Sequence, residues 1–337
     1  MDRAFDWKFW VGLAVSAVFV YLALDQVDLG QVLNEMRSAA PLFLAAGVLM
    51  LITQQILRTV RWRLFLDPIQ ATGFSNRLLA VLVGFAANCL LPARLGEIVR
   101  ANYIGLREGC SRSSALGTLV VERLFDAVVL LGVLYVGLMI TDFTSQWSTL
   151  ASWLRFAGIL LPAAYAGFIL VLAGFKWKAE ACLRLFQKLL FFLPERAQAA
   201  AIDIIRNFSL GLVPMKKTGY WIWAILLSCA VWATGLFQIK FIAVSLNFPL
   251  SLASTFIILA IASISVMIPS APGFIGTFHL AVQYAFMLHG FSPEESLSAA
   301  ILLHAVFFFP TIVFGVGAFL LIHVPLGRLA ARGAASR

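Results

Sequence analysis

Charged residues are scarce in this chain. Asp, Glu, Lys and Arg make up 12% of its 337 residues, against about 25% in soluble domains. Apolar side chains account for 61% of the chain, and its mean hydropathy is +0.93. A soluble fold has no interior that could bury so much apolar surface. The composition therefore excludes a soluble domain and predicts an all-α polytopic membrane protein, with residues 1–337 forming a single integral membrane domain.

Cysteine and catalytic motifs are scarce as well. The four cysteines are scattered and form no CxxC or Cys/His cluster, so we expect neither a disulfide framework nor a metal site. The motifs HExxH, GxSxG and GxxxxGK[ST] are missing from the sequence, and the few acidic residues do not accompany a candidate nucleophile. We therefore expect no enzymatic activity, no cofactor and no nucleotide as an energy source. The net charge of +9 reflects basic residues that flank spans, so we expect no nucleic-acid partner.

Six long apolar runs predict full membrane spans, since each approaches the roughly 20 residues that a bilayer requires. They lie at 8–24, 41–64, 114–140, 154–175, 219–244 and 297–322. The segments 25–40 and 176–217 are amphipathic, which is typical of helices at a membrane surface.

Two further apolar segments are interrupted by helix-breaking residues. The segment 78–107 contains Pro92 and Gly96, and the segment 251–289 contains four such residues, namely Pro269, Pro272, Gly273 and Gly276. Broken backbone is tolerated at membrane depth where it lines a cavity or packs on protein. We interpret both segments as re-entrant broken-helix pairs, which gives eight spans if each pair is counted as one.

The element order repeats, which predicts an inverted repeat formed by residues 1–140 and 154–322. Pro92 and Gly96 align with Pro269 and Gly273 at an offset of 177, because 269 − 92 and 273 − 96 are equal. Inverted repeats with broken helices near the midplane are common in transporters.

Charge is concentrated in the first half of the chain. Arg94, Glu97 and Arg100 follow one another at three-residue spacing, so a helix would place them on one face. Charges inside a membrane usually face a polar pathway or a headgroup site. The segment 114–140 adds Glu122, Arg123 and Asp126, which could equally be an ion-paired cluster that locks helices together. Arg58, Arg61 and Arg63 end the span 41–64 and could instead anchor it in headgroups.

In the second half, the glycines of Pro272-Gly273-Phe-Ile-Gly276 could let the backbone approach a ligand, or could form only a tight turn. His279 and His304 are candidates for proton coupling, although packing partners could also satisfy them. The predicted substrate-binding residues are Arg58, Arg61, Asn88, Arg94, Glu97, Arg100, Glu122, Arg123, Asp126, Pro272, Gly273 and Gly276.

The run Asn88–Arg100, with Val121-Glu122-Arg123-Leu and Pro272-Gly273-x-x-Gly276, resembles the transmembrane region of lysylphosphatidylglycerol synthases, also called flippase-like domain proteins. This resemblance implies a bacterial inner-membrane protein that moves lipids or lipid-linked molecules between leaflets. His279 stands where many members have Glu, and His304 lies near the place of an Arg. The family's aminoacyltransferase domain is not among these residues, so we expect no synthesis of lysyl-lipid.

Two functions follow as hypotheses. The first is a lipid flippase or transporter whose partners are membrane lipids with an anionic headgroup. The second is a non-transporting membrane subunit that supports a lipid-modifying enzyme or glycosyltransferase. An enzyme acting on a lipid-linked substrate is a weaker third alternative, since no catalytic motif supports it.

The loop charges predict the orientation. Eight basic residues lie in 176–217, whereas 141–153 and 289–296 contain no Lys or Arg, so both termini and the segment 176–217 should be cytoplasmic. In a cysteine-free background, a membrane-impermeant thiol reagent should modify single cysteines in 141–153 and 289–296 in intact cells. Modification from outside at position 184 would contradict both the orientation and the inverted repeat.

Overall fold

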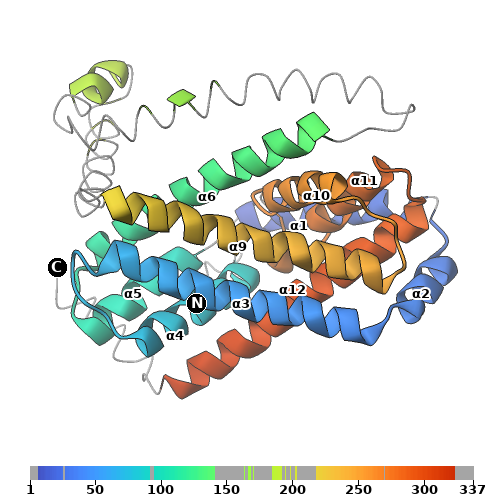
Figure 1. The fold of residues 1–337 in the computed structure, drawn as a ribbon, viewed down its shortest axis with the longest axis horizontal. Coiled ribbons are helices and arrows are strands. Elements are labelled where there is room, and N and C mark those ends of the chain that lie inside the picture. Colours follow the sequence, from blue (N-terminus) through green and yellow to red (C-terminus); the bar gives the residue numbers. More distant parts are fainter. Residues whose placement is uncertain are drawn as a thin grey trace.

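A computed structural model describes residues 7–25, 27–91, 95–140, 184–191, 218–268 and 270–322, with a few isolated residues between 163 and 202. The main elements of this part of the chain are helical (Figure 1). They are α1 (Trp7–Leu24), α2 (Leu29–Ser38), α3 (Pro41–Leu66), α4 (Phe74–Leu90), α5 (Gly96–Glu108), α6 (Arg112–Ile140), α9 (Thr218–Ser245), α10 (Leu252–Ser265), the 3₁₀ turn η4 (Pro272–Phe274), α11 (Thr277–Met287) and α12 (Pro293–Leu321).

Four of these helices, α3, α6, α9 and α12, are long and apolar enough to cross a membrane. They correspond to the predicted spans 41–64, 114–140, 219–244 and 297–322. Helices α1 and α2 meet at 85° and would make a fifth span if counted as one bent pair. The predicted span 154–175 and most of the amphipathic segment 176–217 lie outside the described residues. The structure therefore supports a multi-pass membrane protein with four or five candidate spans in its described part.

Local sequence signals set the helix boundaries. Asp28 caps α2, because its Oδ1 accepts hydrogen bonds from the backbone N–H groups of Gly30 and Gln31 at 2.7 and 3.3 Å. Helix α12 begins with a capping box between Ser292 and Glu295. Both predicted broken segments are interrupted, since α4 is separate from α5 and α10 is separate from α11.

The long helices α3 and α9 pack along each other at the centre of the molecule (Figure 1). The pair α4 and α5 packs together near one end of this central pair, and α10 and α11 pack together near the opposite end. Helix α12 crosses from one end to the other and packs on α4, while α6 packs on α10. Each broken pair is therefore held by a long helix from the other half of the chain.

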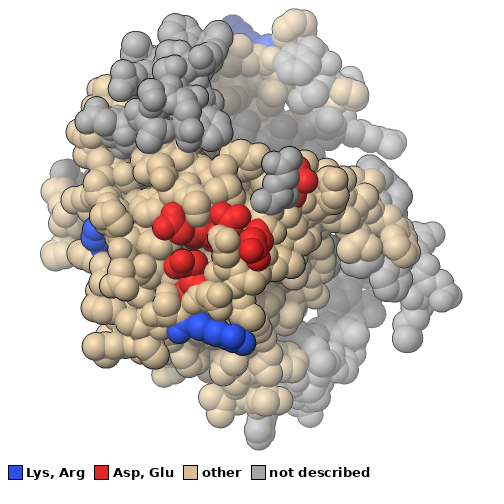
Figure 2. Space-filling model, turned by 90° about the vertical axis from the view of Figure 1, so that its right-hand side faces the viewer, with Lys and Arg blue, Asp and Glu red and all other residues tan. Residues whose placement is uncertain are grey.

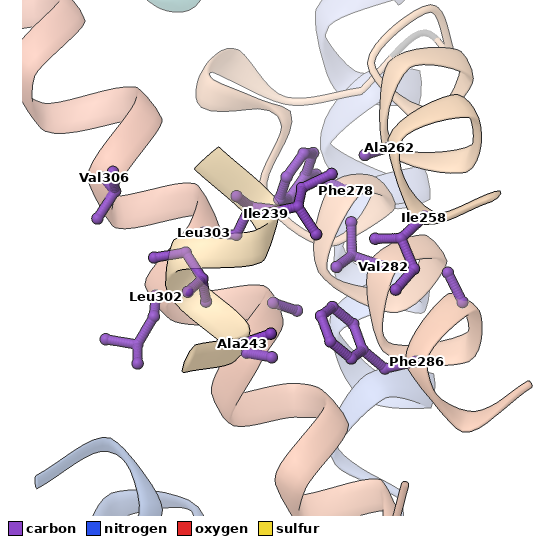
Figure 3. Packing of buried hydrophobic residues seen from close by; sticks show 14 of the residues in the cluster. Ile239, Ala243, Ile258, Ala262, Phe278, Val282, Phe286, Leu302, Leu303 and Val306 are labelled. Atoms are coloured by element: carbon purple, nitrogen blue, oxygen red, sulfur yellow. The ribbon is translucent and has the colours of Figure 1, made fainter. Parts of the chain in front are cut away.

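Two apolar cores stabilise this arrangement. The larger one lies among α9, α10, α11 and α12, where Ile239, Ile258, Phe278, Phe286 and Leu303 gather (Figure 3). The second core joins the helices of the first half and contains, among others, Trp62, Phe65, Ile104 and Phe125. Many apolar side chains on the long helices remain exposed, as expected for surfaces that face lipid.

The two ends of the bundle differ in charge. Figure 2 views the end that carries α2, and acidic side chains gather there. The backbone N–H of Asp28 donates to Glu294 at 3.3 Å, which joins the start of α2 to the start of α12. At the other end, Glu108 accepts from the Asn76 amide at 2.7 Å, and Arg107 donates to the carbonyl of Ile322. Arg77, near the start of α4, and Arg112, the first residue of α6, are further basic residues of the helices at this end.

Small residues allow close helix crossings. A Cβ atom added at Gly315 of α12 would lie 2.1 Å from the Cβ of Ala86 and 2.8 Å from the carbonyl oxygen of Leu82, both on α4. The same atom added at Gly317 would meet nothing within 4 Å. Close approach of α12 and α4 therefore depends on Gly315 but not on Gly317.

We expect Gly315→Ala to lower the melting temperature in detergent, because overpacking at a tight contact costs about 1–3 kcal/mol. Gly317→Ala is the matched control on the same helix. It should be neutral or slightly stabilising, since Ala is about 1 kcal/mol better than Gly in a helix. Equal melting temperatures for the two variants would show that the α4–α12 crossing is looser than described.

Candidate functional site

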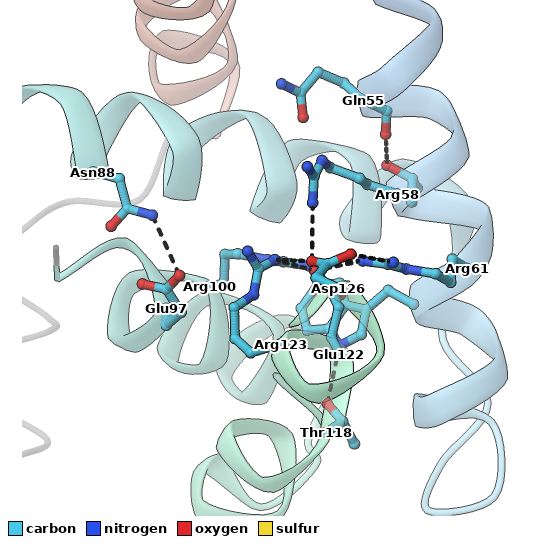
Figure 4. A network of polar contacts seen from close by, with 12 residues as sticks. Gln55, Arg58, Arg61, Asn88, Glu97, Arg100, Thr118, Glu122, Arg123 and Asp126 are labelled. Carbon is cyan, nitrogen blue, oxygen red and sulfur yellow. Dashed lines mark hydrogen bonds and ion pairs between the residues drawn. The ribbon is translucent and has the colours of Figure 1, made fainter. Parts of the chain in front are cut away.

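Three helices of the first half bring six charged side chains together (Figure 4). We call this group the arginine cluster. It consists of Arg58 and Arg61 from α3, Arg100 from α5, and Glu122, Arg123 and Asp126 from α6. Glu122 and Asp126 are one helical turn apart and so share a face of α6. The cluster contains four guanidinium groups and two carboxylates.

Two arginines bind one carboxylate each through a two-pronged contact. Arg61 reaches the two oxygens of Asp126 at 2.6 and 3.2 Å, and Arg100 reaches the two oxygens of Glu122 at 3.1 and 3.2 Å. Parallel N–H···O bonds of this kind are among the stronger polar contacts in proteins. They join α3 to α6 and α5 to α6 in the interior.

The other two arginines do not reach both oxygens of one carboxylate. Nη2 of Arg123 lies 2.6 Å from Oε1 of Glu122 and 3.3 Å from Oδ2 of Asp126. Arg58 approaches Oδ2 of Asp126 at 3.4 Å through Nη1. The Arg123 side chain is 37% exposed, whereas the Arg58 side chain is 8% exposed. The cluster is thus buried on the side of α3 and reaches the protein surface at Arg123.

Aromatic and hydroxyl groups complete the surroundings of the cluster. The Arg100 guanidinium lies 4.3 Å from the centre of the Trp62 ring, and that of Arg58 lies 4.9 Å from the Phe85 ring, distances typical of cation–π contacts. Ser228 of α9 accepts from Arg61 at 2.8 Å. The sequence analysis did not identify Phe85 or Ser228, because both partners come from other helices and neither carries a charge.

The first helix break lies beside the cluster. Oδ1 of Asn88 accepts from the backbone N–H of Gly96 at 2.8 Å, and its Nδ2 lies 3.4 Å from Oε1 of Glu97. A Cβ at Gly84 of α4 would lie 2.2 Å from Cγ of Arg100 of α5. This glycine therefore leaves room for the aliphatic part of the Arg100 side chain. Within the described residues Glu97 has no ion pair closer than 4.0 Å. Arg94 lies outside the described residues.

The second break is held by other elements. Gly273 and Gly276 have φ values of 81° and 89°, a region that favours glycine, and Pro272 starts the intervening 3₁₀ turn. The carbonyl oxygen of Gly273 lies 2.7 Å from Nε2 of His304. The His279 and His304 rings are 4.7 Å apart between centroids. The turn η4 and helix α11 pack against α1, α4 and α12, and His304 is the contact from α12. These five residues are not part of the arginine cluster.

Comparison with known proteins gives several relatives. Glycosyltransferase AglD of Haloferax volcanii is 24% identical over 341 residues, which cover 94% of this chain and 54% of AglD. A UPF0104 membrane protein of Methanothermobacter thermautotrophicus is 24% identical over 320 residues, covering 91% of this chain and 92% of that protein. A UPF0104 membrane protein of Methanocaldococcus jannaschii is 25% identical over 239 residues, covering 70% of this chain and 93% of that relative.

The chain thus spans little more than half the length of AglD, at 54%, but nearly all of the Methanothermobacter protein, at 92%. No solved structure matches the chain. The profile of the family described as the lysylphosphatidylglycerol synthase TM region matches residues 9–315. Because this match covers almost the whole chain, and the described helices are those of a multi-pass membrane protein, the protein belongs to the lysylphosphatidylglycerol synthase transmembrane-region family.

Proposed function

We propose that this protein is a lipid transporter that moves an anionic lipid or lipid-linked molecule between the leaflets of the cytoplasmic membrane. The observation that carries the proposal is the arginine cluster, a group of buried charges beside a broken helix in a membrane protein. Intramembrane charges are costly and usually mark a functional pathway. Arg is suited to phosphate because its planar fork can bind two oxygens at once.

The cluster offers what a headgroup needs in order to cross. An unpaired phosphate in hydrocarbon is strongly disfavoured because it loses its hydration. Fixed guanidinium groups replace part of that hydration, while the lipid tails stay in the bilayer. Arg123 is the member that is both partly exposed and in contact with the two carboxylates. It is therefore our candidate for first contact with the headgroup, and Asn88 and Glu97 would border the same path at the helix break. We propose that Arg94, which lies between them in the sequence, supplies a further cation.

We further propose that the two halves are inverted repeats. The side-chain amide of Gln54 on α3 donates to the carbonyl oxygen of Val231 on α9 at 3.2 Å. In the opposite direction, the side-chain amide of Gln238 on α9 donates to the carbonyl oxygen of Gly47 on α3 at 3.3 Å. The differences 238 − 54 and 231 − 47 are both 184. A pseudo-two-fold axis between α3 and α9 would relate the two bonds in this reciprocal way, as in isologous contacts of dimers.

Other pairs of positions support the same relation. Gly109 before α6 and Gly290 before α12 both have positive φ, 75° and 90°. Gly137 on α6 faces α10, and Gly315 on α12 faces α4. In a two-fold arrangement α4 corresponds to α10 and α6 to α12, so these contacts are equivalent. The broken pairs would then be re-entrant from opposite sides, and the proposed lipid path would run between them.

The orientation in the proposal follows the charge of the two ends. The end with Arg77, Arg107 and Arg112 would face the cytoplasm, and the acidic end of α2 and α12 would face outside. The arginine cluster would then lie in the cytoplasmic half. The expected bacterial inner membrane stays a prediction, because the relatives described above are archaeal.

A second candidate function is a non-transporting membrane subunit of a glycosyltransferase. It is favoured by AglD, which is named a glycosyltransferase and extends well beyond the region that this chain matches. In this case the chain would hold a lipid-linked substrate for an enzyme on another polypeptide. Lipid transfer by the pure protein distinguishes the first function from the second.

We expect Arg123→Ala to reduce the transfer of fluorescent phosphatidylglycerol or phosphatidic acid between leaflets at least tenfold, because it removes the exposed cation of the cluster. The measurement is quenching of the outer-leaflet fluorophore in proteoliposomes. Arg63→Ala is the control, since the Arg63 side chain is 64% exposed and, among the residues that the structure describes, its ion pair is with Asp67 one turn away. Only variants that stay monodisperse in detergent count.

Two results would contradict this proposal. Transfer by Arg123→Ala at the parent rate would make the cluster a structural ion-pair network. A parent protein that transfers no lipid, yet co-purifies with a glycosyltransferase, would favour the second function.

His279 and His304 are our candidates for coupling transfer to protons. Their rings lie 4.7 Å apart between centroids, and His304 contacts the carbonyl oxygen of Gly273, so a change of charge there would act directly on the second break. If coupling exists, the transfer rate should follow a pH gradient across the vesicle membrane. His304→Gln should lose that dependence while still moving lipid. A parent rate that ignores the gradient would exclude this role.

A further inference from the structure

The arginine cluster contains two kinds of arginine, which differ in how their positive charge is neutralised. We propose that Arg58 and Arg123 form a clamp for a phosphate group carrying two negative charges, such as a terminal phosphomonoester, while Arg61 and Arg100 form the framework that holds the helices. This inference rests on the proposed function, because it names the headgroup chemistry at the same site.

The framework pairs are the well-matched ones. The side chains of Arg61 and Arg100 are 0% and 2% exposed, and each meets a carboxylate with two nitrogens. Each pair contributes one positive and one negative charge to the cluster. Arg61 with Asp126, and Arg100 with Glu122, therefore leave no net charge of their own.

Arg58 and Arg123 share the two carboxylates with the framework arginines. Oε1 of Glu122 lies within 3.3 Å of nitrogens from three arginines, namely Arg61, Arg100 and Arg123. Oδ2 of Asp126 is likewise shared among Arg58, Arg61 and Arg123. A carboxylate has about four lone-pair sites. Each carboxylate receives four such contacts, so Arg58 and Arg123 share oxygens with the framework arginines and have no carboxylate of their own.

Donors remain that lack acceptors. The Nε atoms of Arg58 and Arg123 are buried and have no hydrogen-bond partner. The Nε atoms of Arg61 and Arg100 share this state, but their Nη groups are already committed to the paired carboxylates. Buried donors without partners are rare in native structures and call for a ligand or water. An anion with several oxygens would supply the missing acceptors.

Arg58 and Arg123, which we call the surplus arginines because neither has a two-pronged carboxylate partner, lie close enough to share one anion. Arg58 comes from α3 and Arg123 from α6, yet both approach the same oxygen, Oδ2 of Asp126, at 3.4 and 3.3 Å. An anion that contacted both would bridge these two helices. The Phe85 ring lies against Arg58 on another side and presents no acceptor oxygen. Arg123 supplies access, because it is the exposed member of the pair.

The four guanidinium groups and two carboxylates of the cluster leave an excess of two positive charges. This excess sets the preferred charge of the ligand. Phosphomonoesters carry about −1.5 to −2 near neutral pH, whereas a phosphodiester carries one negative charge. A phosphomonoester therefore balances the ion-paired cluster more fully. Glu97 lies outside this cluster at the helix break, hydrogen-bonded to Asn88, and its charge would lower the affinity for any anion. Arg58 and Arg123 are the residues that would select a doubly charged phosphate.

The two classes of arginine should differ in their effect on stability. Loss of a framework arginine strands a buried carboxylate, which is strongly destabilising. Loss of a surplus arginine leaves each carboxylate with its two-pronged partner and removes repulsion between like charges. The melting temperatures of Arg58→Gln and Arg123→Gln should therefore lie within about 2 °C of that of the parent, or above it. Arg61→Gln and Arg100→Gln should melt well below it.

The test is binding of defined lipids to the full chain in detergent, measured by native mass spectrometry together with thermal melting. Phosphatidic acid carries a phosphomonoester, and phosphatidylglycerol carries a phosphodiester. We expect the parent to bind phosphatidic acid at least tenfold more tightly than phosphatidylglycerol. Arg58→Gln and Arg123→Gln should each lose at least tenfold in affinity for phosphatidic acid, and the preference should disappear. Arg63→Gln is the matched control and should bind as the parent does.

Each alternative result has a defined meaning. The clamp is overturned if either surplus variant keeps the preference for phosphatidic acid, or if both melt as low as Arg61→Gln. Inorganic phosphate is the third ligand. If it displaces phosphatidic acid only at large excess, the result supports a lipid headgroup as the ligand. If inorganic phosphate binds as tightly as phosphatidic acid does, the lipid is overturned as the ligand. Transport is judged separately. A parent that shows the clamp but moves no lipid would refute the proposed function alone, and a parent that moves lipid without the preference would refute the clamp alone.

Discussion

The rest of this structure depends on the cost of placing charge inside an apolar protein. Removing an ion from water is strongly unfavourable unless a partner and hydrogen bonds compensate for it. Glu122 and Asp126 project from α6 into the interior and lie at 0% and 4% exposure, so guanidinium groups must meet them there. Arg61 and Arg100 supply these groups from α3 and α5. The ion pairs therefore fix how three helices of the first half lie relative to one another.

Such contacts require helices that approach closely, and small residues provide the space. Gly84 makes room for the stem of Arg100, and a Cβ at Gly96 would lie 2.0 Å from the carbonyl oxygen of Gly84. The Asn88 side chain then closes the break by binding the free N–H of Gly96. The helix break, the close α4–α5 crossing and the buried Arg100–Glu122 pair thus form one connected arrangement. The same break that shortens the helices also brings the cation to its carboxylate.

Much of this was predictable from the sequence, since apolar runs and helix breakers act locally. The spans around α3, α6, α9 and α12 and both interruptions lie where hydropathy, Pro and Gly placed them. Spacing also showed that Glu122 and Asp126 share a face. It could not show which faces of different helices meet, because helical periodicity says nothing about partners. Spacing thus did not show that Arg100 pairs with Glu122 on another helix and not with Glu97, three residues before it. Phe85 and Ser228 likewise contact the cluster only because of how the helices pack.

The contrast between the two halves bears on the proposed transport. The first half places ion pairs beside its break, and the second places a His–Gly contact and aromatic rings beside its own. If the halves are inverted repeats, equivalent positions carry different chemistry. A headgroup would then meet fixed cations in one half only, and the other half would offer little to hold it. A headgroup that leaves the arginine cluster would then meet no second set of fixed cations, so further ion pairing would not slow the rest of its path.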